Sequence, residues 1–274
     1  MILQIQAAHQ GKTIREVLLS FHLGKSTIYK LEEAGAIFIN GSPAKGNDAL
    51  KVKDELLILF ENIDEQAHEP IYEKINILYE DQDYLLVQKP RGILTHSDGK
   101  EISLSNYVAA YFALSPIVAR ACHRLDFETT GMILFSKHLL AHAIMTNLFE
   151  NHSITKEYVA LCHGKFDNPQ GIINAPIGRN RHNDAQIVSK TGKSAVTEYH
   201  VLSFEKGVSR VRVKIEGGRR HQIRVHLASI DHPIVGDTLY GSTANEPMKL
   251  HFEKIEFIHP FTGKLFTHYL PPSW

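Results

Sequence analysis

The sequence has few features that would indicate a membrane, a disulfide framework or a secreted protein. A run of about 18 apolar residues, the usual minimum for a membrane-spanning helix, occurs nowhere in its 274 residues. The N-terminus lacks the basic start and long apolar segment of a signal peptide. Two cysteines, Cys122 and Cys162, make neither a disulfide framework nor a metal-ligand pair. We therefore expect a reduced, cytoplasmic protein without a membrane partner.

Signatures of common cofactors are also missing. The sequence contains no G-x-G-x-x-G segment and no Walker loop. Histidines are numerous, but His221 and His226 are five residues apart, a spacing that fits one helix face poorly and does not match a metal-ligand pair. The sequence therefore predicts neither a metal nor a cofactor.

Charge is unevenly distributed, although 30 Lys and Arg residues balance 30 Asp and Glu residues. Residues 61–84 hold eight acids and one base, whereas residues 153–229 hold thirteen bases and six acids. Screening limits electrostatic attraction to about 8–10 Å, so a polyanion responds to a local patch more than to the total charge. The basic segment favours a nucleic-acid partner over ordinary surface scatter.

The N-terminal part of the sequence has the pattern of a small α/β unit. Thr13 and Glu16 form a capping-box pattern ahead of the apolar residues of a first helix. A second helix is predicted to end at Gly35. The Asn40-Gly41 pair then predicts a tight hairpin turn. This part is therefore expected to fold as two short helices followed by strands.

The remainder predicts a larger α+β domain. Residues 61–74 are acidic, contain Pro70 and lack periodicity, so we interpret them as a linker. Beyond them, strand-like segments alternate with helical ones such as RRHQIRVHLASI. The sequence thus predicts a small N-terminal α/β domain (1–60), an acidic linker (61–74) and an α+β domain with a mixed or antiparallel β-sheet (75–274).

The stretch HRLDFETTG, residues 123–131, places a lone carboxylate between a basic pair and an uncharged Thr-Thr-Gly segment. Two interpretations of this carboxylate, Asp126, are open. It either caps a turn and is neutralised by Arg124, or it is a reactive group that a cation keeps ionised.

This stretch resembles the central motif of the RluA-type pseudouridine synthases, H-R-L-D-x-x-T-S-G. Four other segments resemble further motifs of that family and occur in the family's order. They are LLVQKPRGILTHSDG (85–99), KEYVALCHG (156–164), GKSAVTEYHVL (192–202) and GGRRHQIRVHLASIDHPIVGDTLYG (217–241). The resemblance implies a pseudouridine synthase domain, and hence an RNA uridine isomerase.

The resemblance assigns the chemistry to Asp126. Pseudouridine formation breaks the bond between the sugar and the uracil nitrogen, rotates the base and rejoins it through carbon, with no redox change. Burial disfavours an ionised carboxylate and a nearby cation favours it. By resemblance the cation is Arg224, whose guanidinium can pair bidentately with a carboxylate. Asp126 then acts as a nucleophile or as a base at the sugar.

Two more residues receive roles from the resemblance. Tyr158 would stack on uracil and help to move the proton from carbon 5 of the rotated base. Arg124 would occupy the space that the flipped-out uridine leaves in the RNA. The VGDTLYG part of the segment that contains Arg224 also holds Asp237, which we interpret as a cap because turn residues surround it.

Basic and polar residues of the motifs are the remaining candidates for RNA binding. In the large domain these are His123, Thr129, Lys89, Lys156, Lys193, Arg219, Arg220, His221 and Gln222.

The N-terminal unit resembles the alpha-L RNA-binding motif of a small-subunit ribosomal protein. It holds seven bases and seven acids between Met1 and Asn62, so it must use a local face, for which Lys25, Lys30 and Lys45 are the candidates. A protein partner for this unit is the alternative. We expect a monomer that acts on RNA, ribosomal RNA first and transfer RNA second. A non-catalytic RNA-binding factor and a hydrolase are the competing functions.

Overall fold

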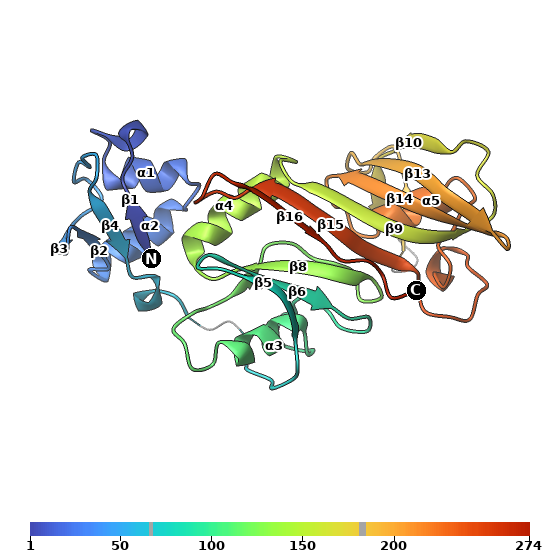
Figure 1. Ribbon diagram of the computed structural model, residues 1–274, viewed down its shortest axis with the longest axis horizontal. Helices are drawn as coiled ribbons and strands as arrows, with labels where there is room; N and C mark the ends of the chain where they lie inside the picture. Colours follow the sequence, from blue (N-terminus) through green and yellow to red (C-terminus); the bar gives the residue numbers. More distant parts are fainter. Residues whose placement is uncertain (66–67, 181–184) are drawn as a thin grey trace. The chain divides into compact units, whose positions relative to one another are not determined.

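We describe a computed structural model of residues 1–65, 68–180 and 185–274. The chain forms two compact units, and each contains segments that are distant in sequence (Figure 1). Among the residues described, no helix is long and apolar enough to cross a membrane. The first unit comprises Met1–Val87, His96–His123 and Leu134–Leu148, and the second comprises Gln88–Thr95, Arg124–Ile133 and Phe149–Trp274.

The N-terminal part of the first unit is a small antiparallel sheet with two helices. The sheet has the strand order β1-β4-β2-β3. The buried residues Ile14, Leu18, Ile28 and Leu31 of the helices form part of its core. The elements are β1 (Ile2–Gln4), η1 (Ala7–His9), α1 (Ile14–Ser20), α2 (Lys25–Glu33), β2 (Ile37–Ile39), β3 (Ser42–Pro43), β4 (Glu55–Ile58) and η2 (Phe60–Asn62).

Local sequence signals predicted most of these elements. The capping box of Thr13 and Glu16 is present at the start of α1. Gly35, with φ +59°, follows the C-cap of α2. Asn40 and Gly41 both have positive φ, as a tight hairpin turn requires, and connect β2 to β3. Strand β1, which precedes both helices, was not predicted.

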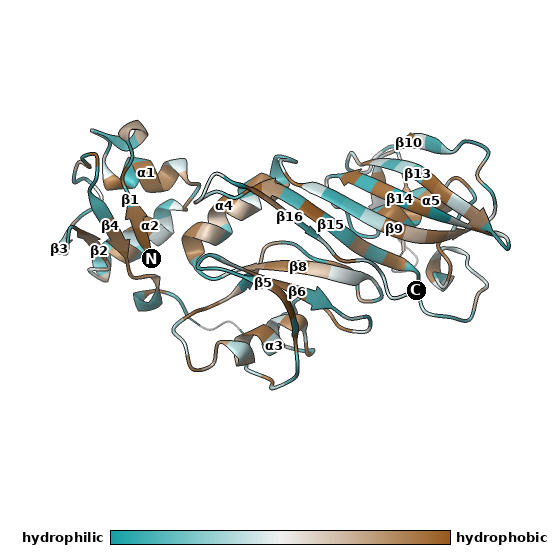
Figure 2. Ribbon diagram, viewed as in Figure 1, coloured by the Kyte–Doolittle hydropathy of each residue, from teal (hydrophilic) through white to brown (hydrophobic). Residues whose placement is uncertain are grey.

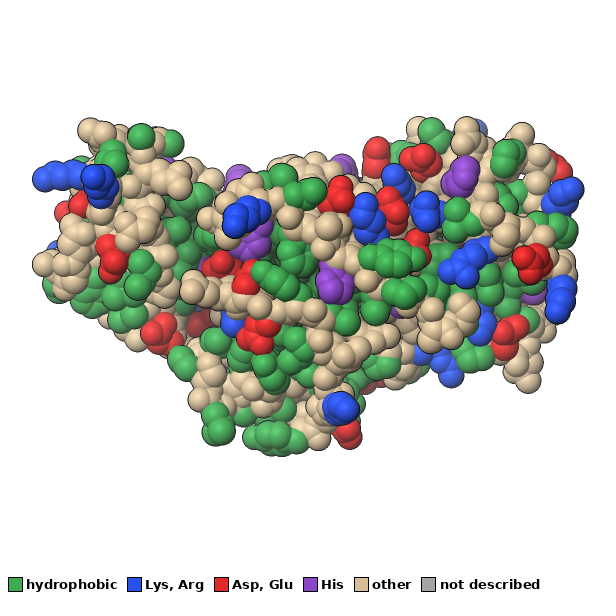
Figure 3. Space-filling view, viewed as in Figure 1, with side chains coloured by type: hydrophobic (Ala, Val, Ile, Leu, Met, Phe, Trp, Pro, Cys, Tyr) green, Lys and Arg blue, Asp and Glu red, His purple; other side chains and the backbone are tan. Residues whose placement is uncertain are grey.

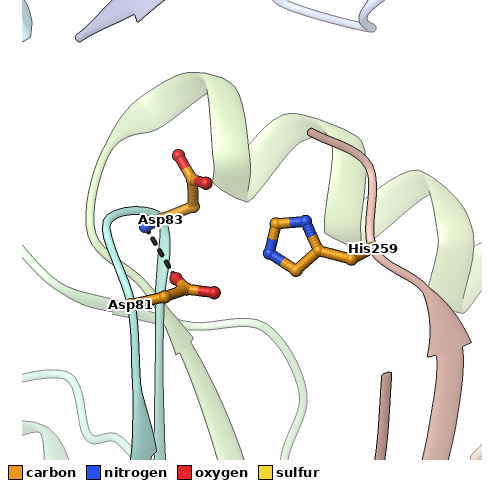
Figure 4. Close-up of side chains that lie close together, drawn as sticks. All are labelled: Asp81, Asp83 and His259. Carbon is orange, nitrogen blue, oxygen red and sulfur yellow. Dashed lines mark hydrogen bonds between the residues drawn. The ribbon is translucent and has the colours of Figure 1, made fainter. Parts of the chain in front are cut away.

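The rest of the first unit holds an acidic turn between two strands. The backbone N–H of Asp83 donates to Asp81 Oδ1 at 2.8 Å (Figure 4), and the N–H of Tyr84 donates to the same oxygen at 2.7 Å. Strand β7 pairs with the end of β8 in antiparallel register. The elements that lie wholly or partly in this unit are β5 (Asn76–Glu80), β6 (Tyr84–Lys89), α3 (Leu104–Tyr111), β7 (Arg120–Ala121), β8 (Thr130–Ser136) and α4 (Leu139–Glu150).

The segment expected to be a linker makes specific contacts within the first unit. Arg120 Nη1 donates to Asp64 at 2.7 Å. Asn106 Nδ2 donates to the carbonyl of Glu69 at 3.0 Å, and the N–H of Ile71 donates to the carbonyl of Asn106 at 3.1 Å. Two positions of the segment, 66 and 67, lie outside the described residues. The domain boundaries at 60 and 74 stay a prediction.

The second unit is built on a long antiparallel sheet with the strand order β10-β13-β14-β9-β15, and β16 pairs with β15. In Figure 2 its strands alternate between hydrophilic and hydrophobic residues, as expected for strands with one buried face. The elements are β9 (Thr155–His163), β10 (Gln170–Asn174), β11 (Ile177–Arg179), β12 (Gln186–Val188), β13 (Val196–Glu205), β14 (Val208–Glu216), α5 (Gln222–Ala228), η3 (Thr238–Tyr240), β15 (Leu250–Ile258) and β16 (Leu265–Tyr269).

A close backbone contact joins the start of β8 to β15. Thr130 and Gly131 pair in parallel register with His251 and Phe252. Gly131 has φ +132°, and a Cβ atom there would lie 2.6 Å from the backbone N and O of Phe252. Only glycine fits this position. The glycine of the HRLDFETTG stretch therefore fixes where the loop that carries Asp126 enters the sheet.

Basic and acidic side chains alternate on one face of the sheet. Arg212 Nε lies 3.7 Å from Glu157 and 3.5 Å from Glu253, and Lys214 Nζ lies 3.3 Å from Glu157. Figure 3 shows blue and red side chains mixed in this way over the molecule. Arg212 and Lys214 are thus paired with acids, so their charge is largely neutralised locally.

Candidate active site

Asp126 lies in the loop between β7 and β8, and neighbouring loop residues hold that loop in place. The N–H of Thr129 donates to the carbonyl of Asp126 at 3.1 Å and closes a turn. Thr95 Oγ1 donates to the carbonyl of Leu125 at 3.2 Å and accepts from its N–H at 3.1 Å. The N–H of Gly92 donates to the carbonyl of Phe127 at 2.9 Å. The carboxylate is therefore carried on a loop with a fixed backbone.

Lys89 is the strongest anchor of this loop. Its side chain is fully buried, and its ammonium donates to the carbonyls of Pro90, Phe127 and Thr129 at 3.0, 3.2 and 2.9 Å. Burial lowers the pKa of Lys89 to about 8, while the charges of Asp126 and Glu128 oppose that shift. Lys89 is thus not placed to contact an RNA phosphate, and we reassign it from RNA binding to positioning of the Asp126 loop.

Replacing Lys89 with methionine should lower the free energy of unfolding by about 2–4 kcal/mol, because three buried carbonyls lose a charged donor. Urea unfolding measures this change. Lys100→Met is the matched control, since the Lys100 side chain is 84% exposed and such a change should stay within about 0.5 kcal/mol. Equal stability of the two variants would show that Lys89 does not anchor the loop.

Arg224 lies in α5, a short helix whose residues Ile223, Val225 and Leu227 are also buried. Its Nη1 is 3.7 Å from Asp126 Oδ2. The expected bidentate pair with Asp126 is not formed. The guanidinium of Arg224 instead binds Asp237 in a bidentate way. Its Nε donates to Oδ2 at 2.7 Å and its Nη2 donates to Oδ1 at 2.8 Å.

The role given to Asp237 from sequence therefore needs correction. Its side chain makes no capping hydrogen bond at the start of η3. It is buried and binds the guanidinium of Arg224. Burial is the largest single influence on Arg224 and lowers its pKa, but the hydrogen bonds and charge of Asp237, together with the charges of Asp126 and Tyr240, raise the pKa above its ordinary value. Asp237 thus fixes the guanidinium with one remaining nitrogen directed at Asp126.

Tyr158 lies in β9 and reaches the same site from the floor of the sheet. It pairs with Val213 of β14 and with Phe252 of β15. Its ring stacks on that of Phe252, with centroids 4.7 Å apart. Burial, and then the charge of Asp126, raise the pKa of Tyr158. Its hydroxyl therefore remains protonated at neutral pH.

The side chains of Asp126, Arg224 and Tyr158 line one cavity of about 210 Å³. Its remaining walls include the apolar side chains of Leu125, Ile215, Ile223 and Leu250 and the polar residues Thr129 and His221. Thr129 is 2% exposed, and its Oγ1 has no hydrogen-bond partner among the described residues. The cavity thus combines apolar walls with a carboxylate, a guanidinium and a free hydroxyl, as a site for a flat polar ring requires.

Several candidates for RNA binding are exposed. Arg124, Arg219 and Arg220 are exposed and line the cavity, so their charges lie at its mouth. Lys193 is exposed beside the β11 backbone. In the first unit, the exposed basic candidates are Lys25, Lys30 and Lys45.

Three other candidates are engaged with the protein itself. Lys156 is buried and donates to the carbonyl of Gly217 at 2.7 Å. Gln222 is buried and donates to the carbonyl of Val196 at 2.8 Å while accepting from the N–H of Arg219 at 3.0 Å. His123 accepts from the N–H of Leu134 at 3.1 Å within the first unit. We therefore assign these three side chains to support of the fold instead of RNA contact.

Tyr240 is a site residue that sequence reasoning missed, as was Asp237. The guanidinium of Arg224 lies 5.1 Å from the centre of the Tyr240 ring, and the Tyr240 hydroxyl lies 3.0 Å from His221 Nδ1. Both missed residues belong to the VGDTLYG segment. The signal available in the sequence was an acid and an aromatic residue in an otherwise turn-like segment.

Comparisons with known proteins show the family to which the chain is similar. A family model described as RNA pseudouridylate synthase matches residues 83–229. An RNA pseudouridine synthase of Bacillus subtilis, YhcT, named as uncharacterized, is 37% identical over 84% of this chain and 79% of its own. Ribosomal large subunit pseudouridine synthase D of Vibrio cholerae is 32% identical over 95% of this chain and 86% of its own. The solved structure of human RNA Pseudouridylate Synthase Domain Containing 1 aligns with a TM-score of 0.63 at 26% identity, covering 74% of this chain and 86% of that one.

The chain therefore belongs to the RNA pseudouridylate synthase family. It is an RNA uridine-to-pseudouridine isomerase, with the α+β fold and largely antiparallel sheet that the sequence predicted.

Proposed function

We propose that Asp126 is the carboxylate that acts at the sugar of the target uridine, with Arg224 and Tyr158 beside it. The observation that supports this proposal most strongly is that the three side chains line one cavity, although they come from a loop, a helix and a strand that are distant in sequence. Asp237 completes the set as a positioning residue for Arg224.

Charge favours Asp126 as the reacting group. Arg224 already satisfies Asp237 with two nitrogens, so Asp126 is left with a cation at 3.7 Å and no bidentate partner. The side chain of Asp126 is 19% exposed, so its oxygens remain accessible to a substrate. Asp237, in contrast, is buried and has both oxygens bound.

Tyr158 is the candidate for handling the proton of the base. Isomerisation breaks the bond between C1′ and N1 and forms the bond between C1′ and C5. The hydrogen on C5 leaves as a proton, and N1 gains one. A neutral phenol next to Asp126 can relay that proton, and its place on the cavity wall supports this role.

RNA approach is assigned to the three exposed arginines at the cavity mouth, Arg124, Arg219 and Arg220. A uridine stacked in RNA cannot reach a cavity that contains a buried arginine, so it must be flipped out. Guanidinium groups at the rim can bind the flanking phosphates and offset part of the unstacking cost.

We further propose that the target lies in ribosomal RNA, with transfer RNA as the second candidate. Support comes from relatives named ribosomal large subunit pseudouridine synthase D, which align over most of this chain. The test is to map pseudouridines in total RNA from cells with and without the gene. Loss of a large-subunit ribosomal site is the expected result, and its return should require a copy with Asp126. An unchanged ribosomal map, with loss of a transfer-RNA site, would contradict the ribosomal assignment.

The N-terminal unit is proposed to bind RNA through the exposed lysines of α2. Lys25→Glu with Lys30→Glu should weaken RNA binding and flatten its salt dependence by about 0.7–0.9 in log–log slope for each phosphate that is no longer neutralised. Lys51→Glu with Lys53→Glu is the matched control, because these exposed lysines carry the same charge in the same unit. RNA titrations at several salt concentrations measure both. Unchanged binding in the α2 variant would favour a protein partner for this unit.

A further inference from the structure

We propose that His221 recognises the target base by donating its Nε2–H to a carbonyl oxygen of uracil, and that Tyr240 and Gln186 fix the ring tautomer that makes this possible. The inference rests on the proposed function of the cavity and adds the feature of the substrate that the cavity reads. None of the three residues forms part of the chemistry assigned to Asp126, Arg224 and Tyr158.

The position of His221 points to a role beyond packing. It directly precedes α5 and has the left-handed backbone conformation, with φ 56° and ψ 20°. This conformation is uncommon for residues other than glycine, and strained backbone of this kind is frequent at functional sites. His221 is 9% exposed and lines the cavity together with Asp126 and Arg224. Its ring is therefore held beside the space that a uracil would fill.

The hydrogen bonds around Tyr240 determine which ring nitrogen of His221 carries the proton. The backbone N–H of Gln186 donates to the Tyr240 hydroxyl oxygen at 2.7 Å. The hydroxyl proton is then free to point at His221 Nδ1, which lies 3.0 Å away. In this arrangement each donor has an acceptor, and Nδ1 is the acceptor of the pair.

The ring is also neutral, so it carries a single N–H. Burial lowers the pKa of His221 to about 4, the charges of Arg224 and Arg220 act in the same direction, and those of Asp126 and Asp237 oppose it. A neutral imidazole that accepts at Nδ1 must carry its proton on Nε2. His221 therefore presents one N–H donor of fixed position at the cavity wall, where burial favours satisfying it with a ligand acceptor.

Uracil suits such a donor throughout the reaction. The base must turn about its N3–C6 axis to bring C5 to the place that N1 held. The same turn exchanges the positions of its two carbonyl oxygens. A fixed N–H directed at one carbonyl before the turn therefore meets the other one afterwards. Cytosine has an amino group in place of one carbonyl, so it would oppose a donor to the N–H in one of the two orientations, which a hydrogen-bonding site rejects strongly.

The first test reads the tautomer in the enzyme without RNA. Two-bond ¹H–¹⁵N correlation spectra of protein labelled with ¹⁵N-histidine distinguish protonated from bare ring nitrogens, and the signals missing from His221→Gln identify His221 among the 17 histidines. The expected result is a neutral Nε2–H form at pH 7 that becomes a tautomer mixture in Tyr240→Phe. A charged ring, or an Nδ1–H form, would overturn the inference.

The second test measures coupling between His221 and the carbonyl oxygens. Single-turnover rates are compared on a synthetic RNA carrying the mapped target as uridine, 2-thiouridine or 4-thiouridine, because sulfur is a weaker acceptor than oxygen. We expect the rate of His221→Phe on uridine to be about tenfold below that of the wild-type enzyme. His221→Gln, which keeps an N–H donor, should recover part of this rate. Replacing uridine by a thio substrate should lower the rate of His221→Phe little further.

Independent, multiplicative losses on both thio substrates would overturn the inference. Absence of any product with the wild-type enzyme would instead count against the proposed function, and the spectra would still report on the tautomer. Tyr240→Phe should lose part of the rate without a change in RNA affinity, since its ring, which lies near Arg224, is retained.

Discussion

Asp126→Asn is expected to abolish isomerisation. The turnover rate should fall roughly 10⁴-fold or more, as is seen when an essential reacting group is removed. The amide keeps the shape of the side chain but can neither attack the sugar nor accept a proton as a carboxylate does. The backbone of the loop that carries it is held by hydrogen bonds with the side chains of Lys89 and Thr95 and with the N–H of Gly92, which the substitution leaves in place. Nucleoside chromatography of digested RNA measures the product.

Glu128→Gln is the matched control for this variant. Glu128 is on the same loop, but its side chain is 39% exposed and pairs with Arg91 at 3.2 Å, so we expect near-normal turnover. Both variants should unfold at the wild-type urea concentration and bind RNA with wild-type affinity. Turnover by Asp126→Asn comparable to that of Glu128→Gln would remove Asp126 from the chemistry.

Arg224→Lys should also be severely impaired, by about 10²–10³-fold in kcat, despite the conserved charge. Arginine uses Nε and Nη2 for Asp237 and keeps Nη1 near Asp126. A lysine ammonium is a single point charge and cannot serve both carboxylates with the same geometry. Steady-state kinetics should show the loss in kcat, with KM for RNA little changed.

Asp237→Asn separates positioning from charge. The variant keeps an arginine at position 224 but removes one of the two carboxylates that hold its guanidinium. We therefore expect a smaller loss in kcat than in Arg224→Lys. If Arg224→Lys instead kept its kcat, raised KM and flattened the salt dependence of RNA binding, Arg224 would be a phosphate contact.

Features encoded by neighbouring residues could be predicted from the sequence. The capping box of Thr13 and Glu16 and the Asn40-Gly41 turn depend on a few adjacent positions, and the structure contains both. Strand alternation gave the antiparallel sheet of the second unit. Strand β1 escaped because three residues are too few to show a period, and its pairing with β4 is a long-range contact.

The partners of charged side chains could not be predicted in this way. Asp126 and Asp237 are both acids in motif segments, and only the fold shows that Asp237 forms the bidentate pair with Arg224. Lys89 resembles a surface lysine in sequence, yet it is buried among carbonyls that come from a loop about forty residues away. Such partners depend on tertiary contacts, which residue type and spacing do not specify.

The most direct measurement of the central claim is tritium release from RNA labelled at carbon 5 of uracil. A reaction that joins C5 to the sugar must expel that hydrogen. Total RNA is prepared with [5-³H]uridine from cells that lack the gene and is then incubated with purified protein. Release by the wild-type enzyme and none above background by Asp126→Asn is the predicted result; equal release by the two proteins would contradict the assignment of Asp126 as the reacting carboxylate.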